Sequence, residues 1–380
     1  MTTGINQEIL TWARERNKLT IEELAQSMKR EPEEIRMWES GDKIPSYTLL
    51  EELAYRHFNI PLAVFFFPEP PSIEDPINKF RRLPDYEYAR LSSDTLRMIR
   101  LSQGYQDSLK ALIDINASIR RIFLDIDSQK MNPIQLATHV RKYIGITIEQ
   151  QFVFDGQESA FKAWRHAIEN VGVFTFKGPL KDKFISGFAL LDDQFPVIFI
   201  NNASSFSRQT FTLIHELGHI LYNIHGVTDV NEEYIDYMNE SDQALEIKCN
   251  AFAAELLVPN DVFEKDKKFI KNVNEDIIVE LAYRYSVSRE VILRKFLDHG
   301  DISRECYLNM SSQWNNDYLR LNYNKQGGNW YLTKLAYLGE GFTQLVFNNY
   351  YNGRISKTEM GYHLNINSKN IDKLEAYLSQ

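Results

Sequence analysis

The sequence predicts a mainly helical α+β protein, and three observations carry that prediction. Helical spacing of apolar residues covers most of the chain, whereas one block near residues 173–200 shows short apolar runs typical of strands. A proline-rich stretch, PEPPSIEDP after Phe67, interrupts the helical pattern and predicts a spacer. The chain has 380 residues, 43% of them hydrophobic, which is enough for two or three cores. We expect domains at 1–71, 72–310 and 311–380.

The first segment reads as four short helices. Apolar residues recur at helical spacing from Ile9, and Thr20 opens a second helix with Glu23 placed three residues later as a capping box. A third helix begins near Pro32, and a fourth follows Pro45. Short helices joined by tight turns predict a helix-turn-helix unit.

The remaining elements follow from the same periodicities. We expect helices at about 92–115, 160–171, 208–222, 241–257 and 276–299, the last with a break at Val287. The strands are VFTF, ISGFALL and PVIFI, which lie within residues 173–200. Two further helical patterns, LAYLGEGFTQLVFNNY and IDKLEAYL, belong to a tyrosine-rich tail. Its aromatic residues are expected to pack a small helical core: Tyr318, Tyr323, Trp330, Tyr331, Tyr337, Tyr350 and Tyr351.

Charge and cysteine content exclude several classes of protein. The 43 basic and 52 acidic side chains give a net charge of -9, which argues against a generic nucleic-acid coat. Two cysteines, Cys249 and Cys306, are too few for a disulfide scaffold. The N-terminus lacks a signal pattern, and the longest apolar run, 60–67, is far shorter than the roughly 20 residues that cross a bilayer. We therefore expect a cytoplasmic protein.

The strongest chemical signal is the motif His215-Glu216-Leu217-Gly218-His219 in an apolar frame. On a helix the two histidines are i and i+4, so both imidazoles project from one face, as two zinc ligands require. Glu216 lies one residue around the helix, where its carboxylate can act on a water without binding the metal itself. Two buried, hydrogen-bonded core histidines are the structural alternative.

The third ligand has two candidates. His225 has the spacing of a third histidine after His219, but that pattern needs a glycine at position 222 for the chain to turn, and this chain has Tyr222. Glu246 lies beside the buried stripe of its predicted helix, where a metal would offset the cost of an unpaired charge. From the residues alone, Glu246 also fits a solvated helix face.

At these residues the chain resembles the ImmA/IrrE family of zinc metallo-endopeptidases. The similar segments are AWRHAIENVGVFTF, ISGFALL, PVIFINN, RQTFTLIHELGHILY and EIKCNAFAAELLVP, within about residues 75–305. The resemblance implies a zincin-like domain in which His215, His219 and Glu246 bind Zn²⁺, Glu216 is the general base, and Asn250 supports a ligand. It also implies cleavage of a partner repressor, or the role of a proteolytic toxin in a toxin-antitoxin pair. Tyr222 and His225 remain alternatives for the oxyanion donor, and a regulator whose metal serves sensing or structure is the alternative function.

The first 71 residues resemble the XRE/Cro-type helix-turn-helix. The resemblance implies that the helix at about 33–39 enters the major groove of operator DNA, with Trp38 and Glu39 holding the turn. This segment nevertheless carries 8 basic and 12 acidic residues, a net charge of -4, whereas DNA affinity depends on basic groups that neutralise phosphates. Docking of a protein partner, or formation of a homodimer, is the alternative.

Overall fold

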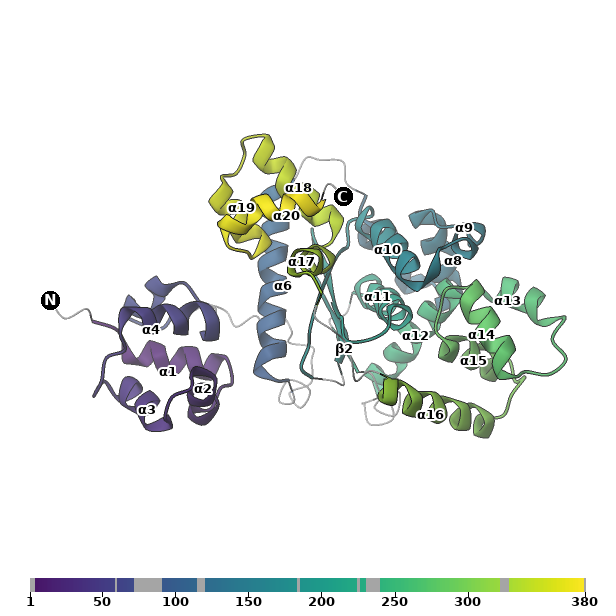
Figure 1. Ribbon diagram of the computed structural model, residues 1–380. Helices are drawn as coiled ribbons and strands as arrows, with labels where there is room; N and C mark the ends of the chain where they lie inside the picture. The colour runs from purple at the N-terminus through teal and green to yellow at the C-terminus, as the bar shows by residue number, and fades with distance from the viewer. Residues whose placement is uncertain are drawn as a thin grey trace. The chain divides into compact units, whose positions relative to one another are not determined.

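The structure is a computed structural model that describes residues 4–58, 60–71, 91–114, 120–182, 185–223, 226–229, 240–321 and 328–378. Most of these residues are helical, and one small sheet is present (Figure 1). The chain divides into two compact units, Met1–Leu101 and Ser102–Gln380, and the division falls within helix α6 (Ser93–Leu112). None of the helices in these ranges is both long and apolar enough to cross a membrane.

The first unit contains the four predicted helices. The Thr20–Glu23 capping box is confirmed: Glu23 N donates to Thr20 Oγ1 at 3.1 Å, and Thr20 N donates to the Glu23 carboxylate at 2.8 Å. The fourth helix is shorter than the apolar pattern suggested, because the chain changes at Leu53 to a π-helical turn. The elements are α1 (Gln7–Arg16), α2 (Ile21–Met28), α3 (Pro32–Ser40), α4 (Tyr47–Glu52), η1 (Leu53–Phe58) and η2 (Leu62–Phe66).

One apolar core holds these short helices together. Trp38 of α3 is 2% exposed and belongs to one cluster of buried apolar residues drawn from α1, α2, α3, α4, η1 and η2. An ion pair also joins α1 to α3, with Arg14 Nε 2.7 Å from Glu39 Oε1. Helices of this length are marginal in isolation, so their packing supplies most of their stability.

The second unit is built on a four-stranded mixed sheet. Its strands are β1 (Phe174–Gly178), β2 (Ile185–Leu190), β3 (Val197–Asn201) and β4 (Gly226–Asp229), in the order β1-β3-β2-β4. β1 is parallel to β3, whereas β2 is antiparallel to both β3 and β4. The first three strands confirm the predicted block; β4 was not predicted, because GVTD is too short and polar to stand out as a strand.

Helices cover the sheet and place the HExxH segment in the core. Helix α11 (Phe206–Leu221) packs on β2 and β3 and lies between α10 (Gly156–Glu169) and α12 (Glu240–Leu257) (Figure 1). α12 also packs against α8 (Pro133–Ile144). The predicted break in segment 276–299 is confirmed, because this segment forms two helices, α14 (Glu275–Arg284) and α15 (Arg289–Asp298), which are separated by residues 285–288. The other elements are α7 (Ile122–Asp125), η4 (Ser128–Lys130), α9 (Ile148–Phe152), α13 (Asn260–Lys267) and α16 (Arg304–Leu321).

The C-terminal helices pack on α6 and β1. Tyr105 of α6 stacks on Phe176 of β1 at 4.1 Å between ring centroids, and Phe342 meets both rings edge-on. The elements are α17 (Trp330–Leu338), α18 (Glu340–Tyr351), α19 (Lys357–Leu364), η6 (Ser368–Asn370) and α20 (Ile371–Leu378).

The prediction that tyrosine and tryptophan side chains pack the core of this tail is confirmed only in part, because Tyr331, Tyr337 and Tyr350 are half-buried. Trp330 and Tyr351 are 49% and 60% exposed, and Tyr318 and Tyr323 lie outside the described side chains. Ring edges that carry N–H or O–H groups keep access to water, so purely apolar side chains fill the interior instead. They are Leu338, Phe342, Val346, Phe347, Met360, Leu364, Ile371 and Leu374.

Candidate metal centre

Helix α11 is buried on nearly every side, which explains its apolar sequence. Ser205 caps its N-terminus by accepting a hydrogen bond from Arg208 N at 3.4 Å. Leu213, Ile214 and Leu217 are fully buried around the HExxH segment. Polar side chains in such a helix need partners, because an unpaired buried polar group destabilises the fold.

The two histidines of the motif and Glu246 converge. His215 and His219 are each 1% exposed, and their Nε2 atoms lie 3.0 Å apart. Helix α12 packs beside α11 and directs Glu246 at both rings: its two carboxylate oxygens lie 3.1 Å from His215 Nε2 and 3.1 Å from His219 Nε2. One ligand atom from each residue lies within 4.8 Å of the others. Three residues predicted to bind a metal are therefore brought together from two helices.

Asn250 fixes the orientation of one ring. It lies one turn after Glu246 on α12, and its Oδ1 is 2.9 Å from His215 Nδ1. An amide oxygen can only accept, so His215 Nδ1–H donates, and Nε2 of the same ring points toward Glu246 and His219, where a metal would bind it. Among the described residues, His219 Nδ1 has no such partner. The structure thus supports one of the two imidazoles directly.

The two imidazoles favour the ionised form of Glu246. Burial opposes a charge on Glu246, but the adjacent His219 and His215 outweigh burial and hold the pKa of this carboxyl well below its usual range. Two imidazole nitrogens and a carboxylate oxygen are ligands that divalent transition metals accept. The residues His215, His219 and Glu246 fit a metal ion in donor type, burial and convergence.

Glu216 lies beside strand β2. It is fully buried, and a Cβ added to Gly187 of β2 would be 3.6 Å from its Oε1. The same added atom would be 2.7 Å from Phe199 O and 2.8 Å from Thr212 Cγ2, so only glycine allows this approach. A glycine inside an otherwise apolar strand is a sequence signal for such a close approach, and the role of Gly187 was not predicted.

Two comparisons bear on this site. Residues 168–297 match the Peptidase_M78 family model, described as the IrrE N-terminal-like domain. The chain is also 36% identical over 100 residues to the radiation response metalloprotease IrrE of Deinococcus radiodurans, an alignment that covers 26% of this chain and 29% of that protein. Both matches support a metallopeptidase of the ImmA/IrrE family. The matched segment contains the whole sheet and both helices that carry the histidine–glutamate cluster.

Close packing of α11 against α12 sets the spacing of the histidine–glutamate cluster. A Cβ on Gly218 would be 3.3 Å from Cys249 Sγ and 3.1 Å from Phe252 Cδ1, so the two helices meet at a glycine. Cys249 is fully buried there, and burial, followed by the nearby Glu246, raises the pKa of its thiol. The thiol therefore behaves as a small apolar group in the core.

The end of α11 concerns Tyr222 and His225, the two alternatives for the oxyanion donor. Tyr222 is the helix C-cap, and the chain turns at Asn223, which adopts a left-handed φ of 58°. The chain therefore leaves the helix one residue after the position where the elongated motif places glycine. Burial, followed by the nearby Cys249, raises the pKa of Tyr222 to about 12, so its hydroxyl keeps its proton at neutral pH. His225 lies outside the described residues.

Proposed function

We propose that this protein is a zinc-dependent endopeptidase that cleaves an internal peptide bond of a partner protein. The observation that carries the proposal is the convergence of His215, His219 and Glu246 beside the buried Glu216. The matches to metallopeptidases support the same chemistry. The substrate we propose is a repressor or an antitoxin-like partner, and a proteolytic toxin of a toxin-antitoxin pair is the related role.

The donor set favours zinc in particular. Ligand bonds of about 2.0–2.1 Å in a tetrahedral site separate the ligand atoms by about 3.3 Å. The observed separations of 3.0 and 3.1 Å are close to this value. Three protein ligands, of the types His, His and Glu, are typical of catalytic zinc sites that keep a fourth position open. Zinc bound by these residues would supply Lewis acidity at a peptide carbonyl.

Glu216 is the residue that we propose moves the proton. Its neighbours in the motif project their rings from another side of α11, so its carboxylate does not compete with them as a ligand. We propose that it accepts the proton of the attacking water and then delivers it to the departing amine. The absence of a side chain at Gly187 leaves room for this carboxylate beside β2.

A Glu216→Gln variant tests the proposal. Glutamine keeps the shape of the side chain but cannot act as a base, so peptide cleavage should fall by about a hundredfold or more while bound zinc stays near one equivalent. The substrate would be the repressor or small antitoxin encoded beside this gene, with cleavage sites located by mass spectrometry of the products. Glu280→Gln, an exposed carboxylate of α14, is the matched control and should cleave like the wild type.

Two outcomes would count against peptide hydrolysis. The first is a zinc-loaded wild-type protein that cleaves no neighbouring repressor or antitoxin. The second is a Glu216→Gln strain with an unchanged cellular phenotype. Together they would favour a regulator whose metal has a sensing or structural role. Products shortened only from one end would contradict internal cleavage and would indicate an exopeptidase.

A further inference from the structure

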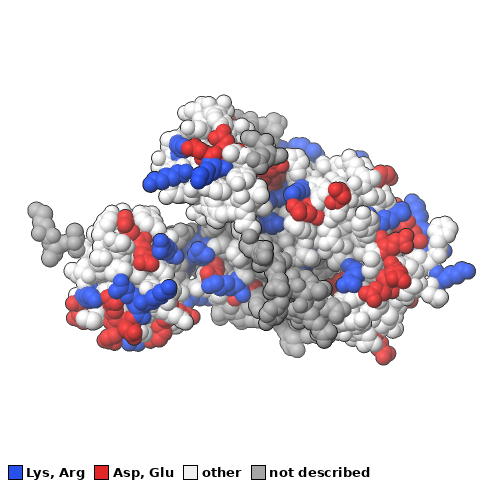
Figure 2. All heavy atoms as spheres, in the orientation of Figure 1, with Lys and Arg blue, Asp and Glu red and all other residues white. Residues whose placement is uncertain are grey.

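The end of α13 and the chain that follows it carry a cluster of lysines. Residues 265–271 comprise four lysines, one aspartate, one phenylalanine and one isoleucine. Lys265, Lys268 and Lys271 are exposed, and their side chains have no ion pair or hydrogen bond with any residue that the structure describes. Figure 1 places α13 and α14 at the right-hand edge of the second unit, and Figure 2 shows blue side chains projecting from that edge. Three ammonium groups are therefore free to meet an anionic partner.

The carboxylates next to these lysines in the chain already have partners. The Tyr285 hydroxyl donates to Asp266 Oδ2 at 2.8 Å, and Arg284 Nε lies 3.4 Å from the same oxygen. Glu264 Oε1 lies 3.1 Å from Nζ of the fourth lysine, Lys267. These contacts engage both acidic residues and one lysine. The other three lysines keep a positive charge that no described carboxylate pairs with, which leaves a local positive field at the surface.

Phe269 is the exposed apolar residue of this segment. It is 89% exposed, the largest fraction of any large apolar side chain in the described part of the chain. The apolar residues that follow it, Ile270 and Val273, pack against the core of the unit. Ile270 N also donates to Lys267 O at 2.9 Å, which closes the turn after α13. The backbone thus returns to the core directly after Phe269 and leaves its ring in water, where apolar surface is unfavourable.

Chain geometry joins this ring and the three free lysines into one surface. Each of the three lysines lies within four residues of Phe269 along the chain. Because one residue spans at most about 3.6 Å, their Cα atoms lie within about 14 Å of the Cα atom of Phe269. All four side chains are exposed. We name Lys265, Lys268, Phe269 and Lys271 the lysine loop.

We propose that the lysine loop docks on the surface of an anionic lipid bilayer. The negatively charged headgroups attract lysines that lie near the surface, and each lysine contributes to binding. The aromatic ring beside them enters the boundary between headgroups and acyl chains, where its apolar surface leaves water. Peripheral contact of this kind needs no membrane-spanning helix. The inference concerns the α13–α14 region and does not depend on peptide hydrolysis.

The exposure of Phe269 favours a bilayer over other anionic partners. A ring that is 89% exposed has almost no side chains beside it, so the loop itself forms no pocket around the ring. Binding of single-stranded nucleic acid combines aromatic rings with a basic groove that follows the backbone. A bilayer accepts an apolar group at any point of its surface. Because the whole chain has a net charge of -9, only a local basic surface can face anionic lipids, and we expect weak, salt-sensitive binding.

Vesicle sedimentation with the full-length chain tests the proposal. The probes are sucrose-loaded vesicles of phosphatidylcholine alone and of phosphatidylcholine mixed with phosphatidylserine. The protein should sediment with the vesicles that contain phosphatidylserine, bind them less as salt rises, and stay in the supernatant with phosphatidylcholine alone. A single-stranded oligonucleotide and a polyglutamate peptide are the competing probes, with binding measured by fluorescence anisotropy.

Lysine variants localise the contact. Lys265→Gln with Lys268→Gln should weaken binding to the phosphatidylserine vesicles roughly tenfold to thirtyfold, because each lysine near an anionic surface contributes a factor of about five. Lys369→Gln with Lys373→Gln makes the same charge change at exposed positions near the C-terminus and should bind like the wild type. Because all four side chains are exposed, both variants should keep the thermal midpoint of the wild type.

Phenylalanine variants test insertion of the ring. Phe269→Ser should weaken vesicle binding about tenfold, because no aromatic surface leaves water on binding. Phe269→Trp should bind at least as tightly as the wild type, since tryptophan also favours the membrane interface. Tyr362→Ser removes an aromatic ring that is 76% exposed on α19, and as the control it should leave vesicle binding unchanged.

Three results would overturn the proposal. Sedimentation that is equal with and without phosphatidylserine, or unchanged in the lysine and serine variants of the loop, would remove the lysine loop as the site. Oligonucleotide binding that is lost in the Lys265→Gln, Lys268→Gln variant, without vesicle binding, would assign the loop to nucleic acid. Polyglutamate binding with the same loss, again without vesicle binding, would assign it to an acidic segment of a protein.

Discussion

Helix α12 carries two buried carboxylates whose surroundings differ in kind. Glu246 and Glu255 are 9% and 7% exposed and lie on different sides of the same helix. Glu255 meets a buried ammonium group, Lys295 Nζ, at 3.0 Å, and also accepts a hydrogen bond from Asn260 N at 2.9 Å. Glu246 meets two imidazoles instead. The first carboxylate faces a permanent charge within the chain, whereas the second faces two rings that can either carry a proton or bind a metal ion.

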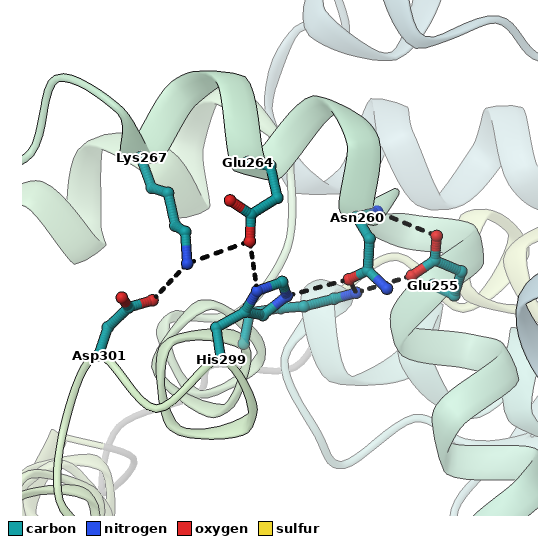
Figure 3. A network of polar contacts seen from close by, with 7 residues as sticks. Glu255, Asn260, Glu264, Lys267, His299 and Asp301 are labelled. Atoms are coloured by element: carbon teal, nitrogen blue, oxygen red, sulfur yellow. Dashed lines mark hydrogen bonds and ion pairs between the residues drawn. The ribbon is translucent and has the colours of Figure 1, made fainter.

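The surroundings of Glu255 form a closed network (Figure 3). Asn260 Oδ1 accepts from Lys295 Nζ at 2.8 Å and lies 3.2 Å from His299 Nε2. The network continues through Glu264, which contacts His299 Nδ1 at 2.6 Å, and through Lys267 to Asp301 at 3.0 Å. It joins the end of α12 to α13 and α15. Each carboxylate in it faces a cationic or hydrogen-bonding partner, as a structural site requires.

The comparison of Glu246 with Glu255 shows how a structural ion pair can be distinguished from a metal site on the same helix. Burial alone does not distinguish the two, since both glutamates are buried. The distinguishing feature is the partner: an ammonium carries its own charge, whereas neutral imidazoles offer lone pairs to a cation. Metal removal should therefore disturb the region of Glu246 and leave that of Glu255 intact.

The largest expected effect is loss of metal in Glu246→Ala. Removing one of three ligands should weaken zinc binding by about a thousandfold, because each ligand supplies a few kcal/mol of the binding free energy. Metal analysis after dialysis should then find zinc in the wild type and in Glu280→Gln, but almost none in Glu246→Ala. Retained zinc in this variant, with loss in His225→Ala, would identify His225 as the third ligand.

Breaking the network should instead destabilise the fold. Lys295→Met leaves Glu255 buried without its counter-charge, which should lower the free energy of unfolding by about 3–5 kcal/mol. Urea titration measures this change, and the folded variant should still bind zinc. Adding Glu255→Leu removes the stranded charge and should restore most of the stability. If Lys295→Met cost less than about 1 kcal/mol, the pair would behave like a surface salt bridge.

Asn250→Ala should have a smaller effect, confined to the metal centre. Loss of the acceptor at His215 Nδ1 frees the ring to rotate, and residues that orient metal-bound histidines typically change metal affinity by about tenfold to a hundredfold. Competition with a coloured chelator measures the affinity. Asn250→Asp keeps an acceptor and should stay near the wild type. Equal zinc affinity in Asn250→Ala would show that packing alone holds the ring.

Much of this arrangement could be predicted from the chain, and the reason differs between its parts. The i, i+4 spacing of His215 and His219 reflects helix geometry, so local sequence carries it. The contribution of Glu246 depends on the packing of α12 against α11, which periodicity alone left open and a family resemblance favoured. β4 and the network around Glu255 depend on contacts between segments that are distant in the sequence. Local sequence patterns therefore do not predict them. The apolar centre of the tail's core was not predicted, because the polar edges of tyrosine and tryptophan keep their rings near the surface.

The smallest expected effect lies where α11 and α12 cross. In Gly218→Ala the new methyl group would be 3.1 Å from Phe252 Cδ1, closer than side-chain carbons normally pack, so the helices should separate slightly. We expect about 1 kcal/mol of destabilisation and a modest loss of zinc affinity, because α12 carries Glu246. Cys249→Ala in the same chain gives the methyl group room and should recover part of both losses. Gly104→Ala, on α6 with open space around it, is the control and should stabilise the protein by up to about 1 kcal/mol. If Gly218→Ala lowered stability but not zinc affinity, the spacing of the two helices would matter for folding alone, and the position of Glu246 would be set elsewhere on α12.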